Sequence, residues 1–341
     1  MATRRTLPLR SPWSHGSQRI LGSSGYRKIL LVVKHTAYES FRQLKIQGRA
    51  PLAVNWERLR NRHNVHKECV ASVQRVLDKQ KANFAVVGRE ELDRQHIAQV
   101  DLVISVGGDG TVLSSSHFLG ENIPLAGVNS DPTTAEEKGS MKLTEERRSI
   151  GALCMCTSLD VEEELPKILS REVEPERRAR LQTSIKSTFT ETRLPPALND
   201  LLLADANPAA VSRFRLGLVH RDGSEAHERF NVWSSGMWVC TPTGSSGSMK
   251  AAGGHPMRPD SSDMQYMVRE HMVEEDMHDI RAKGQGIVPQ GSRIEIRWNS
   301  KYGCVFVDGE YARHELRLGD ELDVTADAPP LLLYAKQPTS S

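Results

Sequence analysis

Aromatic residues and net charge are both scarce in this 341-residue sequence. Only 5% of the residues are aromatic, and 45 Lys and Arg nearly balance 43 Asp and Glu, for a formal net charge of +2. Such a balance gives no electrostatic reason to expect nucleic acid as a main partner. The sequence also lacks any apolar run close to the roughly 20 residues of a membrane-spanning helix, and its mean hydropathy is −0.46. We therefore expect a soluble protein with no nucleic-acid partner and no membrane partner.

Cysteine is scarce as well. Five cysteines are scattered along a chain that is long enough to form a core without disulfides. Their odd number and the lack of a secretory h-region favour a reducing compartment, which we take to be the cytoplasm. Cys154 and Cys156 have no further zinc ligands nearby, so we expect both to be packing residues.

Acidic residues are missing from the first 38 residues, where seven Lys or Arg residues and many serines fall. This composition is typical of a mitochondrial or plastid transit peptide. A disordered basic tail over residues 1–27 explains it equally well. The compartment therefore stays open between the cytoplasm and one of these organelles.

Apolar runs and helical patterns alternate in the first half of the chain. Short β-branched runs predict strands over residues 29–33, 84–87, 102–106 and 124–128, and helical spacing marks 63–81 and 112–119. Strands that alternate with helices predict a doubly wound parallel α/β domain, here over residues 28–160.

The pattern changes after about residue 160. A helical connector is expected over 161–180, followed by strands over 184–191, 197–204, 213–221, 230–233, 293–298, 304–307, 321–325 and 331–334. Turn signals separate these strands, which favours an antiparallel β-sandwich domain over residues 161–325. Residues 326–341 are expected to return towards the N-terminal domain and to end in a short tail.

The most informative segment is the stretch Leu-Val-Ile-Ser-Val-Gly-Gly-Asp-Gly-Thr at residues 102–111. Glycines directly after a strand let bare backbone N–H groups approach a ligand closely, and phosphate is the usual ligand of such a loop. Asp109 brings a carboxylate into the same loop. This arrangement is useful if a metal bridges the carboxylate to phosphates, or if the carboxylate takes a proton from an attacking hydroxyl. The segment therefore points to phosphoryl transfer.

Further polar segments interrupt the second half of the chain. Asn199 and Asp200 lie inside an apolar strand, where they could recognise a ligand or form a satisfied structural pair. Hydroxyls and glycines crowd residues 241–247, which suits phosphate or ribose recognition but also a plain turn. Asp308 and Gly309 are best explained as a hairpin. His63 and His66 are expected on the solvated face of a helix.

The motifs Gly-Gly-Asp-Gly-Thr at 107–111, Asn-Asp at 199–200 and Thr-Pro-Thr-Gly-Ser at 241–245, in this order, resemble the NAD kinase family. Diacylglycerol and sphingosine kinases share the first motif but not the third. Residues 127–133 and 208–214 look like the NADH kinase of plants, and the resemblance spans roughly residues 28 to 335. Two departures from most of the family stand out, since Asn-Ser-Asp-Pro-Thr replaces Gly-x-Leu-Gly-Phe-Leu at 129–133, and Asn-Asp replaces Asn-Glu.

The resemblance implies an α/β domain, a β-sandwich and a site between them. It implies ATP-dependent phosphorylation of the adenosine-ribose 2′-hydroxyl of NADH, and of NAD⁺, with Mg²⁺ or another divalent cation bridged mainly by phosphates and no metal ligand assigned to the protein. Homodimers or larger assemblies are also implied. Asp109 would be the catalytic residue, and the nucleotide-binding residues would be Gly107, Gly108, Gly110, Thr111, Asn129, Asn199, Asp200, Thr241, Thr243, Gly244 and Ser245.

Two alternatives stay open. A lipid kinase would share the glycine loop and would need an exposed apolar entry patch, which the sequence does not show. A dinucleotide sensor would bind without turnover, but it would gain nothing from a carboxylate among phosphates.

Overall fold

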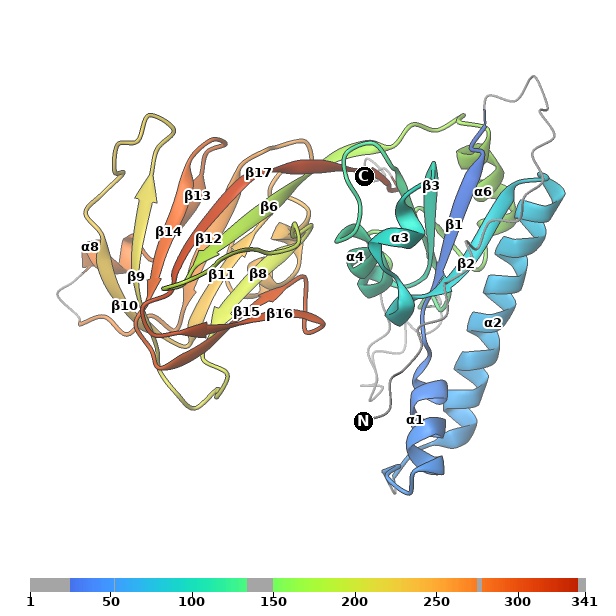
Figure 1. Ribbon diagram of the computed structural model, residues 1–341, viewed down its shortest axis with the longest axis horizontal. Coiled ribbons are helices and arrows are strands. Elements are labelled where there is room, and N and C mark those ends of the chain that lie inside the picture. Colours follow the sequence, from blue (N-terminus) through green and yellow to red (C-terminus); the bar gives the residue numbers. More distant parts are fainter. Residues whose placement is uncertain (1–24, 52, 134–149, 275–277, 337–341) are drawn as a thin grey trace, which may run out of the picture.

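The computed structural model describes residues 25–51, 53–133, 150–274 and 278–336. It has an α/β half and a β-rich half, joined by the long strands β6 and β17 (Figure 1). The basic tail expected over residues 1–27 therefore lies almost entirely outside the described residues. None of the helices in the described ranges is both long enough and apolar enough to cross a membrane.

The α/β half is built from short parallel strands that alternate with helices. Its strands are β1 (Lys28–Val33), β2 (Asn83–Gly88), β3 (Leu102–Gly107), β4 (Leu125–Asn129) and β5 (Cys156–Thr157). Its helices are α1 (Ala37–Ile46), α2 (Trp56–Lys79), η1 (Arg89–Glu91, 3₁₀), α3 (Arg94–Ile97), α4 (Asp109–Ser116) and α6 (Val161–Leu169).

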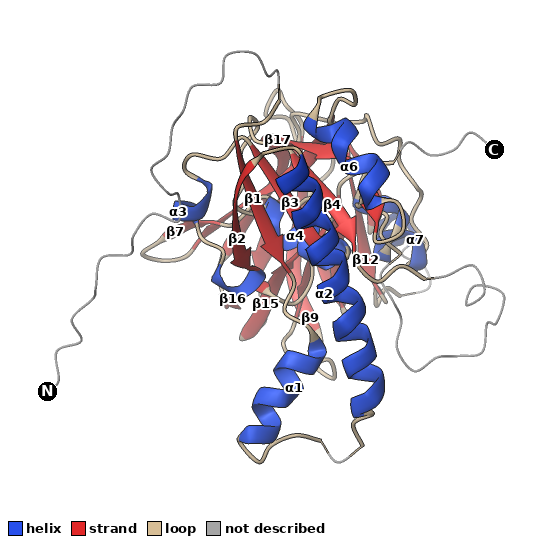
Figure 2. Cartoon of the chain, turned by 90° about the vertical axis from the view of Figure 1, so that its right-hand side faces the viewer, coloured by secondary structure: helices blue, strands red, loops and turns tan. Residues whose placement is uncertain are grey.

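Both faces of this parallel sheet are covered, which explains its nearly continuous apolar strands. Alternate residues of β1 and β3 belong to two separate cores. Ile29 and Leu31 pack under α2 and α6, whereas Leu30 and Val32 pack under α3 and α4. Figure 2 shows α2 running across the front of β1, β3 and β4.

The chain order makes β1 and β3 a topological switch point. The strands lie in the order β4-β3-β1-β2, so the chain leaves β1 towards one edge and β3 towards the other. The helices that follow, α2 and α4, cover opposite faces. Loops that diverge in this way leave a crevice at the carboxyl ends of the strands, where ligands of such sheets bind.

The β-rich half is a sandwich of antiparallel strands. Its strands are β6 (Glu176–Lys186), β7 (Glu191–Arg193), β8 (Asp200–Ala204), β9 (Ser212–Val219), β10 (Phe230–Ser234), β11 (Gly236–Cys240), β12 (Met264–Arg269), β13 (Gln285–Val288), β14 (Arg293–Trp298), β15 (Tyr302–Val307), β16 (Ala312–Arg317) and β17 (Glu321–Tyr334). Short helices η2 (Gly244–Ser246, 3₁₀), α7 (Ser248–Ala251) and α8 (His278–Ala282) interrupt them. One core, which includes the stacked rings of Phe214 and Trp298, fills the space between the two sheets.

Strand β17 belongs to both halves. Its first part pairs antiparallel with β14 and β6, and its last residues pair parallel with β4, where Leu333 lies opposite Leu125. A single eleven-stranded sheet therefore continues from the sandwich into the α/β half, while the other sandwich sheet has the order β13-β12-β11-β8-β15-β16.

Several predictions from the sequence need correction. The expected helical connector over 161–180 is helical only in α6, which packs on α2, so the chain leaves the α/β half after α6 rather than at residue 161. From Glu176 the chain is strand β6, where pairing with β17 overrides a charged sequence. The strand expected over 184–191 is split by a turn between β6 and β7. Helix α1 and strands β5, β11, β12, β13 and β16 were not predicted.

The histidine prediction was half wrong. His66 is only 1% exposed and lies on the buried face of α2, whereas His63 is half-buried. His66 lies with Leu59, Cys69 and Val73 on the buried face of α2, whereas its neighbour Val65 is 43% exposed.

Candidate functional site

The glycine loop joins a fully buried strand to a helix. Strand β3 ends at Gly107, Gly108 caps helix α4 in an extended conformation, and Asp109 is the first residue of that helix. A Cβ at Gly107 would overlap the Thr111 hydroxyl and would touch Lys34 Cβ at 3.0 Å, so this position needs glycine. Around Gly110, in contrast, there is open space. The loop thus exposes backbone at the N-terminus of a helix, which favours anions.

The Asp109 carboxylate is held by a second loop. It accepts hydrogen bonds from the backbone N–H groups of Gly151, Ala152 and Leu153, at 3.1, 3.2 and 2.8 Å. Asn129, at the end of β4, is 1% exposed, and its side chain lies against Gly151. Asp109 and Asn129 therefore meet through the loop at 151–153, which the sequence did not reveal.

Asn199 and Asp200 lie where β8 begins. The backbone oxygens of Leu198 and Asn199 accept hydrogen bonds from the Thr241 hydroxyl, at 2.5 and 3.3 Å. The Thr241 N–H also donates to Asn199 O at 2.9 Å. A Cβ at Gly244 would overlap the Asn199 carbonyl, so the two segments predicted from the sequence are in direct contact.

Thr243 and Ser245 have different surroundings. Ser245 is 1% exposed, its hydroxyl donates to Pro242 O at 2.7 Å, and it accepts from the Met257 N–H at 2.8 Å. The structure thus gives Ser245 a position that holds the loop together. The Thr243 hydroxyl is buried and has no hydrogen-bond partner among the described residues.

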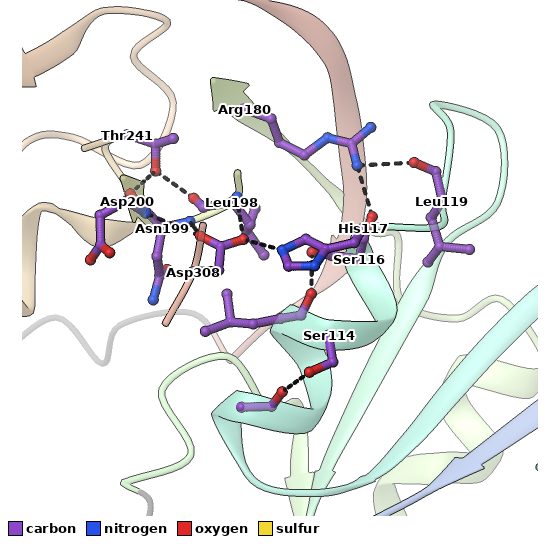
Figure 3. A network of polar contacts seen from close by, with 12 residues as sticks. Ser114, Ser116, His117, Leu119, Arg180, Leu198, Asn199, Asp200, Thr241 and Asp308 are labelled. Atoms are coloured by element: carbon purple, nitrogen blue, oxygen red, sulfur yellow. Dashed lines mark hydrogen bonds and ion pairs between the residues drawn. The ribbon is translucent and has the colours of Figure 1, made fainter. Parts of the chain in front are cut away.

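Asp308 anchors the start of β8. It lies in the hairpin between β15 and β16, as the sequence predicted, but its side chain is fully buried. Its carboxylate accepts hydrogen bonds from the N–H groups of Leu198, Asn199 and Asp200, at 2.8, 2.7 and 3.1 Å (Figure 3). The backbone therefore turns around this carboxylate at the residues where a ligand would be recognised.

The same carboxylate connects the two halves of the molecule. His117, which caps the C-terminus of α4, lies with Nε2 3.0 Å from Asp308 Oδ2. Arg180 of β6 is fully buried, and its Nη1 donates to Ser116 O and Leu119 O, at 3.0 and 2.9 Å (Figure 3). A cation at a helix C-terminus is favourable. These contacts fix the position of α4, and hence of Asp109, relative to the sandwich.

A cavity of about 430 Å³ lies beside this network. Leu113 of α4 forms one wall, and Asn199, Asp200 and Asp308 line another. The remaining lining includes a row of half-buried side chains that are paired across three neighbouring strands, namely Trp238, Leu202 and Phe306. An apolar row with two aromatic rings offers a surface on which a planar base can stack.

One of the two carboxyl groups in this cavity, that of Asp200, has a raised pKa. Burial raises the pKa of Asp200 to about 7, and the nearby Asp308 adds to the shift. The cavity therefore holds a carboxyl group that titrates near neutral pH, which is common at binding and catalytic sites.

Comparison with known proteins identifies the family. Residues 34–131 match the family model described as ATP-NAD kinase N-terminal domain. A "Probable NADH kinase" from Oryza sativa subsp. japonica is 38% identical over 284 residues, which cover 82% of this chain and 84% of the relative. The chain belongs to the NAD kinase family. An "NADH kinase" from Arabidopsis thaliana is 35% identical over 312 residues, covering 90% of this chain and 95% of the relative.

Solved structures of NAD kinases share the fold. An NAD kinase from Archaeoglobus fulgidus in complex with ATP aligns with a TM-score of 0.59 and 18% identity, covering 91% of this chain and 94% of that one. Yeast NADH kinase complexed with NADH aligns with a TM-score of 0.63 and 16% identity, covering 92% and 85%. The expected fold class, a parallel α/β region followed by an antiparallel sandwich, is thereby confirmed.

The sequence did not reveal the roles of three residues of this candidate site. His117, Arg180 and Asp308 tie α4 to the sandwich, and none of them stands in a motif that predicts such a contact. Of the predicted site residues, only Asn199 and Asp200 line the 430 Å³ cavity. Thr241 and Gly244 contact the backbone at Leu198 and Asn199 instead.

Proposed function

We propose that this NAD kinase family member transfers the γ-phosphoryl group of ATP to the adenosine-ribose 2′-hydroxyl of NADH, and of NAD⁺, with NADH preferred. One observation carries the proposal. Helix α4 begins with Asp109 beside the glycine loop, and the same helix contributes Leu113 to the cavity bordered by Asn199 and Asp200. The preference for NADH is supported by the names of the rice and Arabidopsis relatives.

In this proposal the cavity holds the acceptor dinucleotide. A planar base stacks on the row formed by Trp238 and Phe306, and its ribose hydroxyls meet the polar groups of Asn199 and Asp200. Asn199 Oδ1 is buried without a hydrogen-bond partner among the described residues, so a ligand donor would satisfy it.

The proposed chemistry depends mainly on positioning. A ribose hydroxyl is a weak nucleophile, and holding it in line with the γ-phosphorus supplies much of the rate. Asp109 would orient the hydroxyl and accept its proton. The three N–H donors of the loop at 151–153 hold its carboxylate in place at the helix N-terminus. The backbone of Gly107, Gly108 and Gly110, with Thr111, would hold phosphate oxygens.

We propose that the divalent cation enters with the phosphates of ATP, as part of the substrate. The described residues contain no cluster of three or more His, Cys, Asp or Glu side chains that could hold a metal by themselves. The cation would neutralise phosphate charge beside Asp109. Assembly into homodimers, and a location in the cytoplasm, mitochondrion or plastid, also remain proposals.

The test is a coupled assay for NADPH and NADP⁺. Purified protein receives ATP and Mg²⁺ with either NADH or NAD⁺, and the product is measured with an NADP(H)-specific dehydrogenase. Faster turnover of NADH supports the whole proposal, whereas faster turnover of NAD⁺ contradicts the preference. Binding of both dinucleotides without product would favour a sensor, and transfer to a lipid alcohol would favour a lipid kinase.

A further inference from the structure

A second cavity, of about 630 Å³, lies between the two halves of the molecule. Elements η1, α3 and α4 contribute its wall on the α/β side, and the segment between β7 and β8, the start of β16 and part of β17 contribute the wall on the sandwich side. Among the described residues, it shares no lining residue with the 430 Å³ cavity. A volume of this size fits a small organic molecule, and ligand sites often form where two structural units meet.

This second cavity lies away from the proposed reacting group. Asp109 begins α4, whereas Phe118, which belongs to the lining, follows the end of that helix. At about 1.5 Å per helical residue, the two positions are about 13 Å apart along the helix axis. The residues of the glycine loop, all of them described, are absent from the lining. A molecule bound there would therefore lie outside the proposed reaction centre.

Each wall of the second cavity carries an exposed aromatic ring. Phe118 on the α/β side is 36% exposed, and Tyr311, directly before β16, is 69% exposed. Pro195 and Pro329 add further exposed apolar surface to the sandwich wall. Large apolar side chains that face a hollow are removed from water when a ligand covers them, which favours a ligand with an apolar body.

Three arginines line the same cavity, together with one carboxylate. The arginines are Arg89, Arg94 and Arg193, and the acid is Glu90. Glu90 already pairs with Arg89, whose Nη2 lies 3.0 Å from Glu90 Oε1. The side chains of Arg94 and Arg193 have no hydrogen bond or ion pair among the described residues. Both guanidinium groups can therefore pair with an acidic group of a ligand, and their forked geometry suits carboxylates, sulfonates and phosphates.

Arg89 and Tyr311 connect the two walls. The Arg89 guanidinium lies 4.5 Å from the centroid of the Tyr311 ring, and the Arg89 side chain is only 14% exposed. A cation over an aromatic face is attracted by the ring. The contact joins η1 to the hairpin that carries Asp308.

Both walls also reach the network around Asp308. His117, which lines the second cavity, lies with Nε2 3.0 Å from Asp308 Oδ2 (Figure 3). On the sandwich side, residues 193–196 lead into residues 198–200, whose N–H groups donate to the Asp308 carboxylate. A ligand that contacts both walls therefore stabilises the arrangement in which α4 and the start of β8 together line the 430 Å³ cavity.

We propose that this second cavity is an effector site for an organic anion that has an aromatic or otherwise apolar body. The apolar body covers Phe118 and the prolines, and the acidic group pairs with Arg94 and Arg193. The bound anion holds the two halves together and so strengthens binding of the dinucleotide. The anion site does not depend on the proposed function, whereas its effect on the dinucleotide rests on that function.

Binding of 8-anilinonaphthalene-1-sulfonate to the full chain tests the site, because this probe joins aromatic rings to one acidic group and fluoresces more strongly when bound. We expect its Kd to rise roughly tenfold in Arg193→Met, and likewise in Arg94→Met, from the loss of one charge-assisted contact. The matched control is Arg75→Met, because Arg75 of α2 is exposed and lies outside the cavity. N-phenyl-1-naphthylamine has the same rings without the sulfonate, so its Kd should not change in any of these variants.

Three results would overturn the anion site. The first is an equal Kd for the sulfonate probe in Arg193→Met, in Arg94→Met and in the control. The second is the lack of saturable binding of this probe to the unchanged protein. The third is competitive displacement of the probe by NAD⁺, which would place the probe in the 430 Å³ cavity instead.

Titration calorimetry of NAD⁺, with and without saturating sulfonate probe, measures the effect on the dinucleotide. We expect the affinity for NAD⁺ to rise at least about fivefold when the probe is bound, and to rise clearly less in Arg193→Met at the same probe concentration. Equal NAD⁺ affinity with and without bound probe refutes the coupling. If NAD⁺ does not bind at all but probe binding depends on Arg193, the proposed function fails and the anion site stands.

Discussion

Replacing Asp308 by Asn tests whether one buried carboxylate both joins the two halves and shapes the cavity that we propose for the dinucleotide. Oδ1 of Asp308 accepts from the N–H groups of Asn199 and Asp200, and Oδ2 accepts from the Leu198 N–H and lies 3.0 Å from His117 Nε2. An amide can keep one oxygen in place. Its NH₂ group would then face the Leu198 N–H and the His117 ring.

The expected loss of stability follows from the hydrogen bonds that the amide cannot accept. The hydrogen bond from the Leu198 N–H to a charged acceptor disappears, which is worth about 1.5–3 kcal/mol, so Asp308→Asn should lower the free energy of unfolding by about that amount. The backbone N–H of Leu198, directly before Asn199 and Asp200, also loses its acceptor, and we expect KM for the dinucleotide to rise at least tenfold. Removal of the Asp308 charge should in addition lower the pKa of Asp200 from about 7.

Chemical denaturation, followed by tryptophan fluorescence, measures the free energy of unfolding. A pH series of KM for NADH measures both the change in KM and the shift in the Asp200 pKa. Asp327→Asn is the control, because Asp327 is exposed and its side chain has no hydrogen bond among the described contacts. The reasoning is refuted if Asp308→Asn unfolds within about 1 kcal/mol of the control and keeps the same KM at every pH.

Three further outcomes are expected. Gly244→Ala should push the Asn199 carbonyl away and raise KM for the dinucleotide. The control Gly120→Ala, whose Cβ would meet nothing within 4 Å, should leave KM unchanged, and equal KM values in the two variants would contradict the close approach. Asp109→Asn should lower kcat at least about 100-fold with a melting temperature measured alongside, and near-normal kcat in a folded variant would exclude the catalytic role. Because the Asp200 pKa is raised to about 7, the folded state binds a proton between about pH 4 and pH 7 that the unfolded chain lacks. The unfolding free energy from this group therefore falls as pH rises through that window, and thermal melts of Asp200→Asn should show a flatter pH dependence than the unchanged protein.

The glycine loop could be predicted from sequence because its signal is local. Two glycines after an apolar run predict that a strand ends there and that its backbone is exposed. The structure places Gly107 and Gly108 at that boundary. The contact of Gly244 with Asn199 could be suspected only through the family motifs. The residue types of the segment at 241–247, taken alone, fitted a plain turn as well as a ligand-binding loop.

The connection between the halves could not be predicted in this way. Asp308 and His117 are 191 residues apart, and Arg180 lies 149 residues from its partner Pro329. An Asp-Gly pair in a hairpin looks the same whether its carboxylate is exposed or buried, since the local turn needs are identical. Arg180 was expected near the end of a helix, and only pairing of β6 with β17 shows that it points into the interior.

The course of β17 has a consequence for synthesis on the ribosome. Leu333 and Tyr334 pair with Leu125 and Ala126, so one edge of β4 is completed by residues made about 200 positions later. Until they emerge, the nascent α/β half presents an open parallel edge with an apolar strand, the type of surface that pairs with other chains. Nascent chains that stop before β17 should therefore bind chaperones or aggregate, although they contain every residue of the glycine loop.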